Sequence, residues 1–447
     1  MRGEVMVVGR AVTFAVVLAA LLIGGVMLSA VIGQLAISPA EVVGSILRAI
    51  GIPNPLAPQD PILESTLWVV RFPRIAMAIG VGAALAVAGA VMQSIFGNPL
   101  AEPGVVGVSS GGALGAAIAI VIGVTALGSA TIAAFAFVGS LIATLLVYFV
   151  ARANGRTEVV TLLLTGIAVN AFAGAGLASM LFIADSGGRE QIVFWQLGSL
   201  NGSSWPEVGI VVFATSIAAG AALILTKQYD LLALGERNAR HLGVNVERLR
   251  IVSIVLVALL TGVAVAFCGI IAFVGLVVPH TVRMAIGPSH RPLILASAFG
   301  GAALMVYSDL LARSVVIGAD LPIGLLTSLI GGPFFFFLLY RQRKRSGGWK
   351  HRAGSWHRSR PSKFATRAIM RNCRWSARRS LIWSPADGAA PAMKIVRNSM
   401  CPLHRNVAWQ KGDHAGLHRV RCRRRVGDFR AACLPIWRGQ GDCGRAQ

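Results

Sequence analysis

The feature that most constrains this chain is a set of apolar runs long enough to cross a lipid bilayer. In residues 71–115, RFPR is followed by about twenty apolar and small residues, a break at Asn98-Pro99 and a Gly/Ser-rich apolar segment. A soluble core helix with glycine and alanine on every face would lose packing volume, whereas membrane helices use small residues to approach closely. The pattern therefore predicts a polytopic, all-α membrane protein.

Composition agrees with this class. Of the 447 residues, 55% are hydrophobic and 13% are charged, whereas soluble domains carry about 25% charged residues. Within the apolar runs, Gly82 and Gly89 lie two helical turns apart, and Gly107, Gly111 and Gly115 recur at four-residue spacing. These spacings favour close packing between neighbouring membrane helices.

The C-terminal part of the chain differs from the rest. Residues 346–447 hold 22 of the 42 basic residues, 4 of the 18 acidic residues and five of the six cysteines. A basic nucleic-acid-binding arm is one interpretation. An Arg-rich, Glu-free segment with tryptophan and cysteine fits a shifted reading frame or read-through better, so we expect a disordered tail and no nucleic-acid partner. The predicted domains are a transmembrane domain, residues 1–345, and this tail.

The sequence matches motifs that are typical of enzymes only weakly. The string GVSSG at 107–111 matches the nucleophile elbow G-x-S-x-G, which also needs a strand-to-helix turn, a histidine and an acid. Inside a membrane span it indicates helix packing instead. The sequence has no Walker A string and no zinc-type Cys/His spacing. We therefore expect no catalytic residue, no metal site and no cofactor bound by this chain.

Several strings in residues 11–345 resemble the motifs of one family. These are RFPR (71–74), NPLAEPG (98–104), LGERNARHLG (234–243), GIIAFVGLVVPHTVR (269–283) and DLLAR (309–313). They are similar to motifs of the FecCD family, the membrane subunits of ABC importers for ferric siderophores, heme and cobalamin. The resemblance implies the type II ABC importer permease fold, with about ten transmembrane helices.

The resemblance gives three arginines a binding role. In the family, arginines of the R-x-P-R and D-x-x-x-R motifs receive glutamates from the two lobes of a substrate-binding protein. The matching positions are Arg71, Arg74 and Arg313. Complementary charge would orient the docking partner. The alternative is that each arginine extends to the membrane interface, as long cationic side chains often do.

Residues 231–250 are too polar to span a bilayer and contain two glycine breaks. They resemble the family's L-loop, two short coupling helices that sit in a groove of the ATPase. The pattern L-G-E-x-x-A-x-x-L-G falls on Leu234, Gly235, Glu236, Ala239, Leu242 and Gly243. Such a loop would carry rigid-body motion from the ATPase into the spans. An ordinary positively charged connector is the alternative.

The remaining motif positions carry structural expectations. Asn98 and Pro99 are expected to form the inner turn between the second and third spans. Pro279 lacks an amide hydrogen and is expected to kink or end the eighth span near the inner surface. His280 and Arg283 would then face the cytoplasm or the ATPase.

Hydropathy, with the seventh and eighth spans divided by the family resemblance, predicts ten spans. They lie near residues 11–36, 75–96, 105–124, 130–151, 158–184, 206–226, 250–267, 268–283, 292–312 and 321–340. The first apolar run exceeds the roughly 7–15 residues of a signal peptide, so we interpret it as a retained helix. Basic loops at 152–156, 227–250, 283–291 and 341–345 place both termini in the cytoplasm.

The function implied by the resemblance is that of a permease subunit in the inner membrane of a bacterium. It would import an iron chelate by alternating access, and the similarity of residues 195–201 to heme permeases slightly favours heme over a ferric siderophore. Its partners would be a second copy, two ABC ATPase subunits that hold ATP-Mg, and a periplasmic or lipid-anchored binding protein.

Two alternatives stay open for the function. A cobalamin permease of the same family would share these motifs. A secondary transporter driven by an ion gradient would carry acidic residues within the membrane, whereas Asp185, Asp309 and Asp320 fall near the outer ends of predicted spans.

Overall fold

The computed structural model describes residues 2–356, apart from residues 125, 127, 129, 154–155, 158 and 317–319. Each of the ten predicted spans corresponds to a helix in this part of the chain, which confirms the predicted all-α fold. These helices are α1 (Arg2–Val31), α4 (Phe72–Phe96), α5 (Val108–Ile122), α6 (Ala130–Ala151), α7 (Val159–Ile183), α9 (Trp205–Ile224), α12 (Val246–Cys268), α13 (Val274–Ile286), α14 (His290–Ala312) and α15 (Ile323–Trp356).

Short elements connect the long helices. They are α2 (Pro39–Ala49), α3 (Pro61–Ser65), the π-helical turn η1 (Thr66–Arg71), the 3₁₀ turn η2 (Pro103–Val106), α8 (Ser186–Leu197), α10 (Thr226–Leu232) and α11 (Glu236–His241). The strands β1 (Arg152–Ala153) and β2 (Arg156–Thr157) form a small antiparallel hairpin. Because η1 continues directly into α4, the second span is longer than hydropathy indicated.

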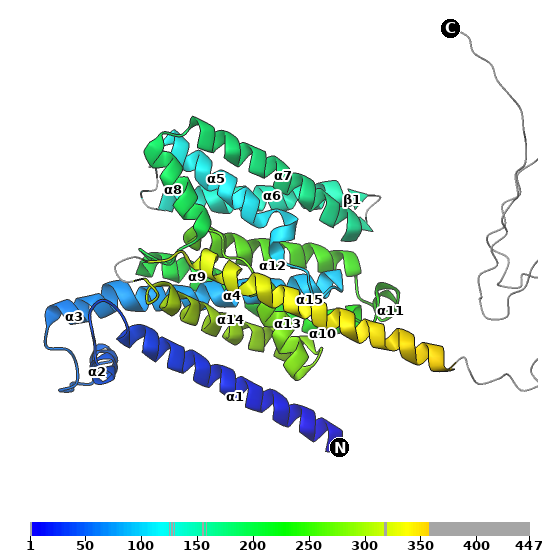
Figure 1. The fold of residues 1–447 in the computed structure, drawn as a ribbon, viewed down its shortest axis with the longest axis horizontal. Coiled ribbons are helices and arrows are strands. Elements are labelled where there is room, and N and C mark those ends of the chain that lie inside the picture. Colours follow the sequence, from blue (N-terminus) through cyan, green and yellow to red (C-terminus); the bar gives the residue numbers. More distant parts are fainter. Residues whose placement is uncertain are drawn as a thin grey trace, which may run out of the picture. The chain divides into compact units, whose positions relative to one another are not determined.

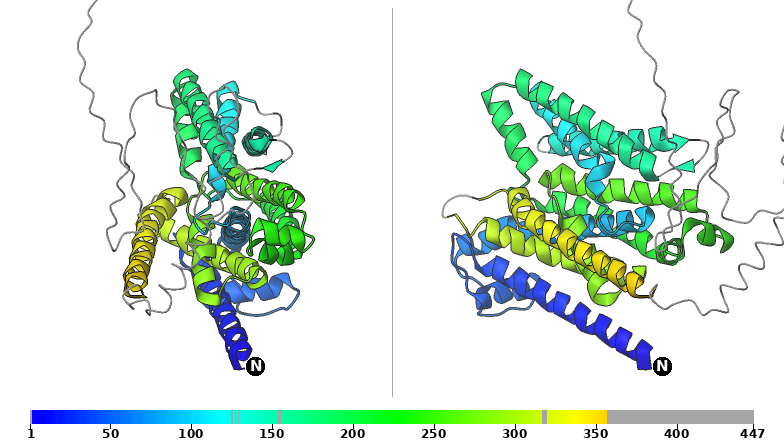
Figure 2. Two further views of the ribbon diagram at one scale, coloured as in Figure 1. Left: turned by 90° about the vertical axis from the view of Figure 1, so that its right-hand side faces the viewer. Right: turned by 45° about the vertical axis from the view of Figure 1, so that its right-hand side comes forward.

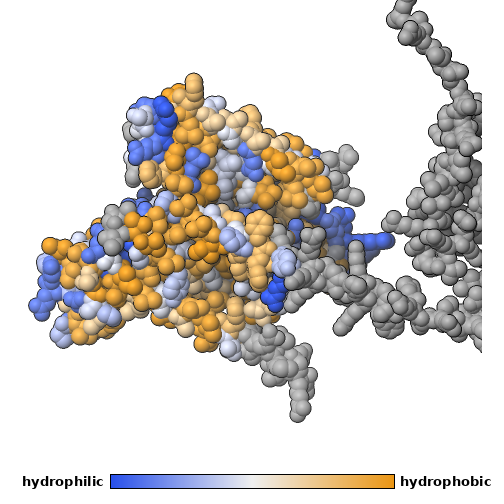
Figure 3. Space-filling view, viewed as in Figure 1, coloured by the Kyte–Doolittle hydropathy of each residue, from blue (hydrophilic) through white to orange (hydrophobic). Residues whose placement is uncertain are grey.

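Seven of the described helices are long and apolar enough to cross a membrane, and α5, α13 and residues 323–337 are shorter apolar helices. On the face shown in Figure 3, hydrophobic residues cover the middle of the helical part, and hydrophilic residues gather toward its ends. Large exposed side chains in the middle include Val16 of α1, Phe213 of α9 and Phe299 of α14. Such an apolar belt suits contact with lipid acyl chains.

The connecting elements define two ends of the helical bundle. The end with α2 and α3 holds the C-terminus of α1, and we name it the α2 end (Figures 1 and 2). At the opposite end, the α11 end, lie the N-terminus of α1, helices α10 and α11, and the last turns of α15. The first span thus begins at the α11 end, and the last span finishes there. That this end faces the cytoplasm stays a prediction.

Helix α4 forms the centre of the bundle, because nearly every residue from Arg74 to Ile95 is buried. Its glycines permit unusually close approach to two neighbours. A Cβ atom at Gly82 would lie 2.2 Å from the carbonyl oxygen of Gly301 in α14, and one at Gly89 would lie 1.8 Å from that of Gly275 in α13. The packing predicted from the glycine spacing is therefore present.

Helices α5 and α6 pack in the same way. A Cβ at Gly111 would lie 2.5 Å from the carbonyl oxygen of Gly139, and one at Gly115 would lie 2.2 Å from that of Phe135. Gly107 begins α5 with a φ of 84°, a conformation that disfavours other residues. The G-x-S-x-G string thus lies at a helix–helix contact, as expected.

Pro279 does not end its helix. Helix α13 begins after Phe273, whose φ is 68°, and continues through Pro279 to Ile286. Proline leaves the carbonyl four residues earlier without its helical partner, and here that residue is Gly275, whose carbonyl packs on Gly89 of α4. A close helix contact at that carbonyl is compatible with the proline inside α13.

The predicted tail lies outside the described residues from position 357 onward. Helix α15 continues to Trp356, past the predicted domain boundary at residue 345. Because residues 357–447 lie outside the described part of the chain, the disorder of the tail stays a prediction.

Candidate functional site

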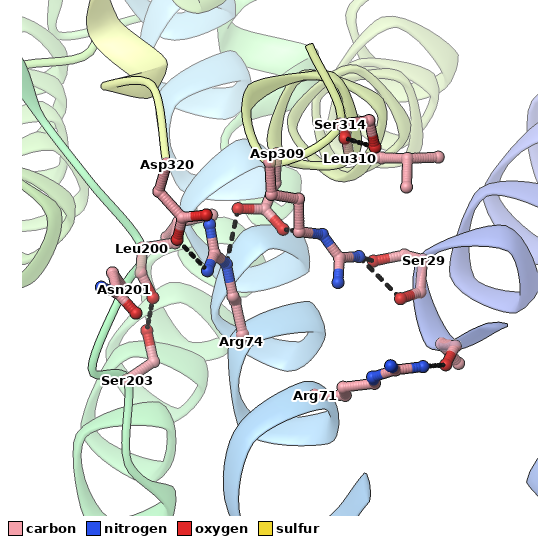
Figure 4. A network of polar contacts seen from close by, with 12 residues as sticks. Ser29, Arg71, Arg74, Leu200, Asn201, Ser203, Asp309, Leu310, Ser314 and Asp320 are labelled. Atoms are coloured by element: carbon pink, nitrogen blue, oxygen red, sulfur yellow. Dashed lines mark hydrogen bonds and ion pairs between the residues drawn. The ribbon is translucent and has the colours of Figure 1, made fainter. Parts of the chain in front are cut away.

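A buried ion network occupies the α2 end. In the first turn of α4, Nε of Arg74 lies 2.8 Å from Oδ1 of Asp309 in α14, and Nη1 lies 2.8 Å from Oδ2 of Asp320, just before α15 (Figure 4). Arg74 and Asp309 are almost fully buried, whereas the Asp320 side chain is 29% exposed. One guanidinium group thus joins α4, α14 and the start of α15.

Arg313 extends this network to α1. Its Nε lies 3.6 Å from Oδ2 of Asp309, and its Nη2 donates a 2.6 Å hydrogen bond to the carbonyl of Ser29. Two carboxylates and two arginines therefore form one cluster in which opposite charges alternate. Pairing of this kind offsets the cost of removing charges from water.

Arg71 lies beside the cluster and caps α1. Its guanidinium donates to the carbonyl of Val31 at 3.0 Å, and also to the carbonyls of Ala30 and Leu35. The last carbonyls of a helix have no partner within the helix. A buried arginine satisfies them here, and Arg71 itself is 4% exposed.

The three predicted docking arginines therefore lie at the same end of the molecule, but their guanidinium groups bind this chain. Asp320 is the partner of Arg74 with the larger exposed fraction. Sequence motifs placed Arg313 at the end of α14, whereas Arg71 and Arg74 lie inside the continuous helical segment Pro61–Phe96. They gave no sign that the side chains turn inward, because an arginine that reaches the interface and a buried one have the same hydropathy.

The predicted coupling loop, residues 231–250, lies at the opposite end and contains the last two residues of α10, all of α11 and the start of α12 (Figure 1). Gly235 and Gly243 have φ values of 101° and 86°, so both predicted breaks are glycines in the left-handed region. Ala239 of α11 is buried against the bundle, whereas Leu234 and Leu242, on either side of α11, expose about 60% of their surface.

Ion pairs fix α11 against the bundle. Glu236 lies 3.4 Å from Arg240 in the same helix and pairs with Arg250, a buried residue of α12. Beside the loop is a hollow of about 520 Å³, with Leu225, Gln228, Leu242, Arg248 and Val252 among its lining residues. Both apolar and polar groups thus line the surface next to α11.

The other motif positions are arranged as follows. Asn98 accepts a 3.0 Å hydrogen bond from the Leu100 amide, so Asn98-Pro99 forms the predicted turn after α4. His280 and Arg283 are half-buried in the second half of α13. Whether they face an ATPase stays a prediction.

Three polar contacts, one buried and two partly buried, escaped the sequence analysis. Glu102 accepts the Phe273 amide at 3.1 Å, Tyr229 and Ser253 share a 2.8 Å hydrogen bond, and Asp230 contacts His290. Partners are 171, 24 and 60 positions apart. Because these partners are far apart along the sequence, no local spacing of residues could have revealed the contacts.

Among the described residues, no three His, Cys, Asp or Glu side chains gather into a group that could hold a metal ion. The ionisable residues of the two ends instead form pairs and short chains of charge.

Known proteins share both the sequence and the fold. The hemin transport system permease protein HmuU of Yersinia pestis is 41% identical over 288 residues, which cover 63% of this chain and 85% of that protein. The cobalamin import system permease protein BtuC of Halobacterium salinarum is 40% identical over 280 residues, covering 62% and 74%. The Fe(3+)-citrate import system permease protein YfmD of Bacillus subtilis is 37% identical over 285 residues, covering 64% and 83%.

A solved structure is also similar. It is an inward-facing ABC transporter assigned to the metal-chelate type, with a TM-score of 0.63 and 32% identity over 72% of this chain and 97% of that one. The profile of the FecCD transport family matches residues 21–341, which include all ten long helices in whole or in part. From this match and the ten-helix fold, we conclude that the chain belongs to the FecCD transport family.

Proposed function

We propose that this chain is the membrane-spanning subunit of an ATP-driven importer for an iron chelate, with heme favoured over a ferric siderophore. The observation that carries the proposal is the match of the FecCD profile across the ten-helix body, residues 21–341. The similarity to a hemin permease along 85% of that protein supports heme. Because the relatives also include a cobalamin permease, the substrate requires a direct test.

The two ends of the bundle would have different partners. ATP would be bound and hydrolysed by separate ABC ATPase subunits, which would contact Leu234 and Leu242, on either side of α11, at the cytoplasmic surface of a bacterial inner membrane. A periplasmic or lipid-anchored binding protein would dock at the α2 end and deliver the chelate. Alternating access would follow when ATP-driven motion of the coupling loop rearranges the spans.

Docking would use the exposed edge of the ion network. A carboxylate of the binding protein would replace Asp320 on Arg74, while buried Asp309 stays in place. Exchange of one carboxylate for another keeps the arginine paired, which avoids the cost of a buried unpaired charge. Attraction between the charged surfaces would weaken as salt increases.

The test is ATP-driven uptake into proteoliposomes that contain the full chain and the ATPase and binding protein encoded beside it. Binding protein loaded with heme, with a ferric siderophore or with cobalamin is compared with the empty protein. Stimulation of both ATPase activity and uptake by the heme-loaded form is expected. Stimulation by cobalamin alone would overturn the iron-chelate assignment, and uptake that follows a proton or sodium gradient without ATP would overturn the importer class.

A further inference from the structure

The first residue of α14 is held by a residue of α10, directly before the coupling loop. One oxygen of Asp230 in α10, Oδ1, accepts a 3.0 Å hydrogen bond from the His290 amide and lies 2.7 Å from Nδ1 of the His290 ring. The His290 side chain is 2% exposed, whereas that of Asp230 is 44% exposed. A single carboxylate oxygen therefore binds both the backbone and the ring of His290.

Asp230 caps the N-terminus of α14 in place of the residue that precedes the helix. The residue in the capping position, Ser289, makes no side-chain hydrogen bond to the helix. An acidic group at a helix N-terminus satisfies free amides and interacts favourably with the helix dipole. Because Asp230 comes from α10, the cap of α14 is also a connection between two elements.

A neighbouring pair fastens α10 to α12. Tyr229 is fully buried, and its hydroxyl lies 2.8 Å from that of Ser253 in α12. Ser253 donates its own proton to the carbonyl of Leu249, so Tyr229 is the donor in the pair. The Tyr229 ring also lies 5.8 Å from that of His290. The residues Tyr229 and Asp230 thus join α10 to both α12 and α14.

Helix α14 connects this junction with the ion network at the other end. It runs unbroken over 23 residues, or about 34 Å, and its one proline, Pro292, lies in the first turn, where a missing amide costs little. In its middle, Gly301 lies against Gly82 of α4, and near its end Asp309 binds Arg74. If the first residue of α14 is displaced, the helix would therefore carry that displacement to the far end of the bundle.

We propose that Asp230 and His290 are positioning residues that make α10 and α14 move as one body. Motion of the coupling loop would then travel along α14 to the Arg74–Asp309–Asp320 network, where the binding protein would dock. This inference rests on the proposed function, because it assumes that an ATPase moves the loop. It assigns the transmission to one helix and one side-chain pair.

The experiment measures uptake per ATP hydrolysed in the reconstituted complex of full chain, ATPase and loaded binding protein. Asp230→Ala removes the shared oxygen and is expected to lower this ratio at least about fivefold, the low end of usual coupling energies, with basal ATP hydrolysis kept. Asp230→Asn retains an acceptor oxygen and is expected to preserve most of the ratio. Lys227→Ala, an exposed charge on the same helix, is the matched control and should leave it unchanged.

A second measurement tests the pair itself. If the two residues act through each other, Asp230→Ala combined with His290→Gln should lose no more coupling than the worse single variant. If Asp230→Ala fails to assemble, Asp230→Ser, which also lacks the carboxylate, takes its place in the cycle. Losses that multiply, or an unchanged ratio in Asp230→Ala, would overturn the inference while the wild-type complex still transports. A wild-type complex without ATP-driven uptake would instead overturn the proposed function and the inference with it.

Discussion

At the residue scale, the two carboxylates on Arg74 differ in their surroundings, and this gives a prediction. Asp309→Asn removes a fully buried charge, so Arg74 and Arg313 lose their common partner. Breaking a buried pair typically costs about 3–5 kcal/mol. We expect a clearly lower thermal unfolding midpoint in detergent. Asp320→Asn is the matched control, because its partly exposed side chain should cost less than about 1 kcal/mol.

The same two variants separate anchoring from docking. If a binding protein competes with Asp320 for Arg74, Asp320→Asn should bind that protein more tightly at low salt. Equal destabilisation by both substitutions would contradict the distinction drawn here between a structural and a displaceable carboxylate. Binding that is unchanged in Asp320→Asn would separate Arg74 from docking without affecting the stability argument.

Sequence reasoning located part of this cluster and missed the rest for a physical reason. Asp309 and Arg313 are four positions apart on one helix, a spacing that brings side chains together. Asp320 is 246 positions from Arg74, in the segment between α14 and α15, and tertiary packing brings the two residues into contact. Motifs therefore identify the two arginines and Asp309, whereas the second carboxylate, Asp320, joins the network only through tertiary structure.

At the scale of elements, the glycine contacts of α4 give a second prediction. In Gly89→Ala the new methyl group would overlap the Gly275 carbonyl, so α4 and α13 must separate. Overpacking of this kind costs about 1–3 kcal/mol, and we expect a lower unfolding midpoint. Gly220→Ala in α9 has no atom within 4 Å of the new Cβ and should leave stability unchanged or slightly raised. Equal losses in both variants would contradict the packing argument.

Helix positions followed well from hydropathy, but helix breaks did not. The span predicted at 206–226 matches α9, because apolar length alone defines it. The eighth span was predicted to start at 268, directly after the seventh, whereas α13 starts at Val274. Phe273 interrupts the helical backbone because it adopts a left-handed conformation, and its amide donates a hydrogen bond to Glu102. A break stabilised by a residue from a distant turn has no local sequence signal.

At the scale of the whole molecule, α7 and α9 are both exposed over most of their length. Helix α9 presents large apolar side chains such as Phe213 and Ile217, which suit contact with lipid. Helix α7 exposes large apolar side chains near its two ends, Leu164 and Phe182, and between them the small residues Ala168, Ala171, Ala175 and Ala178 along one face. Small residues at three- and four-residue spacing allow another helix to approach closely, so this face fits the second copy that the proposed importer requires.

The last prediction tests that assignment by oxidation of single cysteines. In a full-length background with the native cysteines replaced by alanine or serine, Ala171→Cys, Ala175→Cys and Ala178→Cys are introduced one at a time. Because a disulfide needs Cα atoms within about 7 Å, at least one should give a dimer-sized band in membranes, and Ile217→Cys on α9 should give none. Dimers from Ile217→Cys alone would place the second copy on α9. If no position gives a dimer, the small-residue face of α7 does not contact a second copy, and the assignment is wrong.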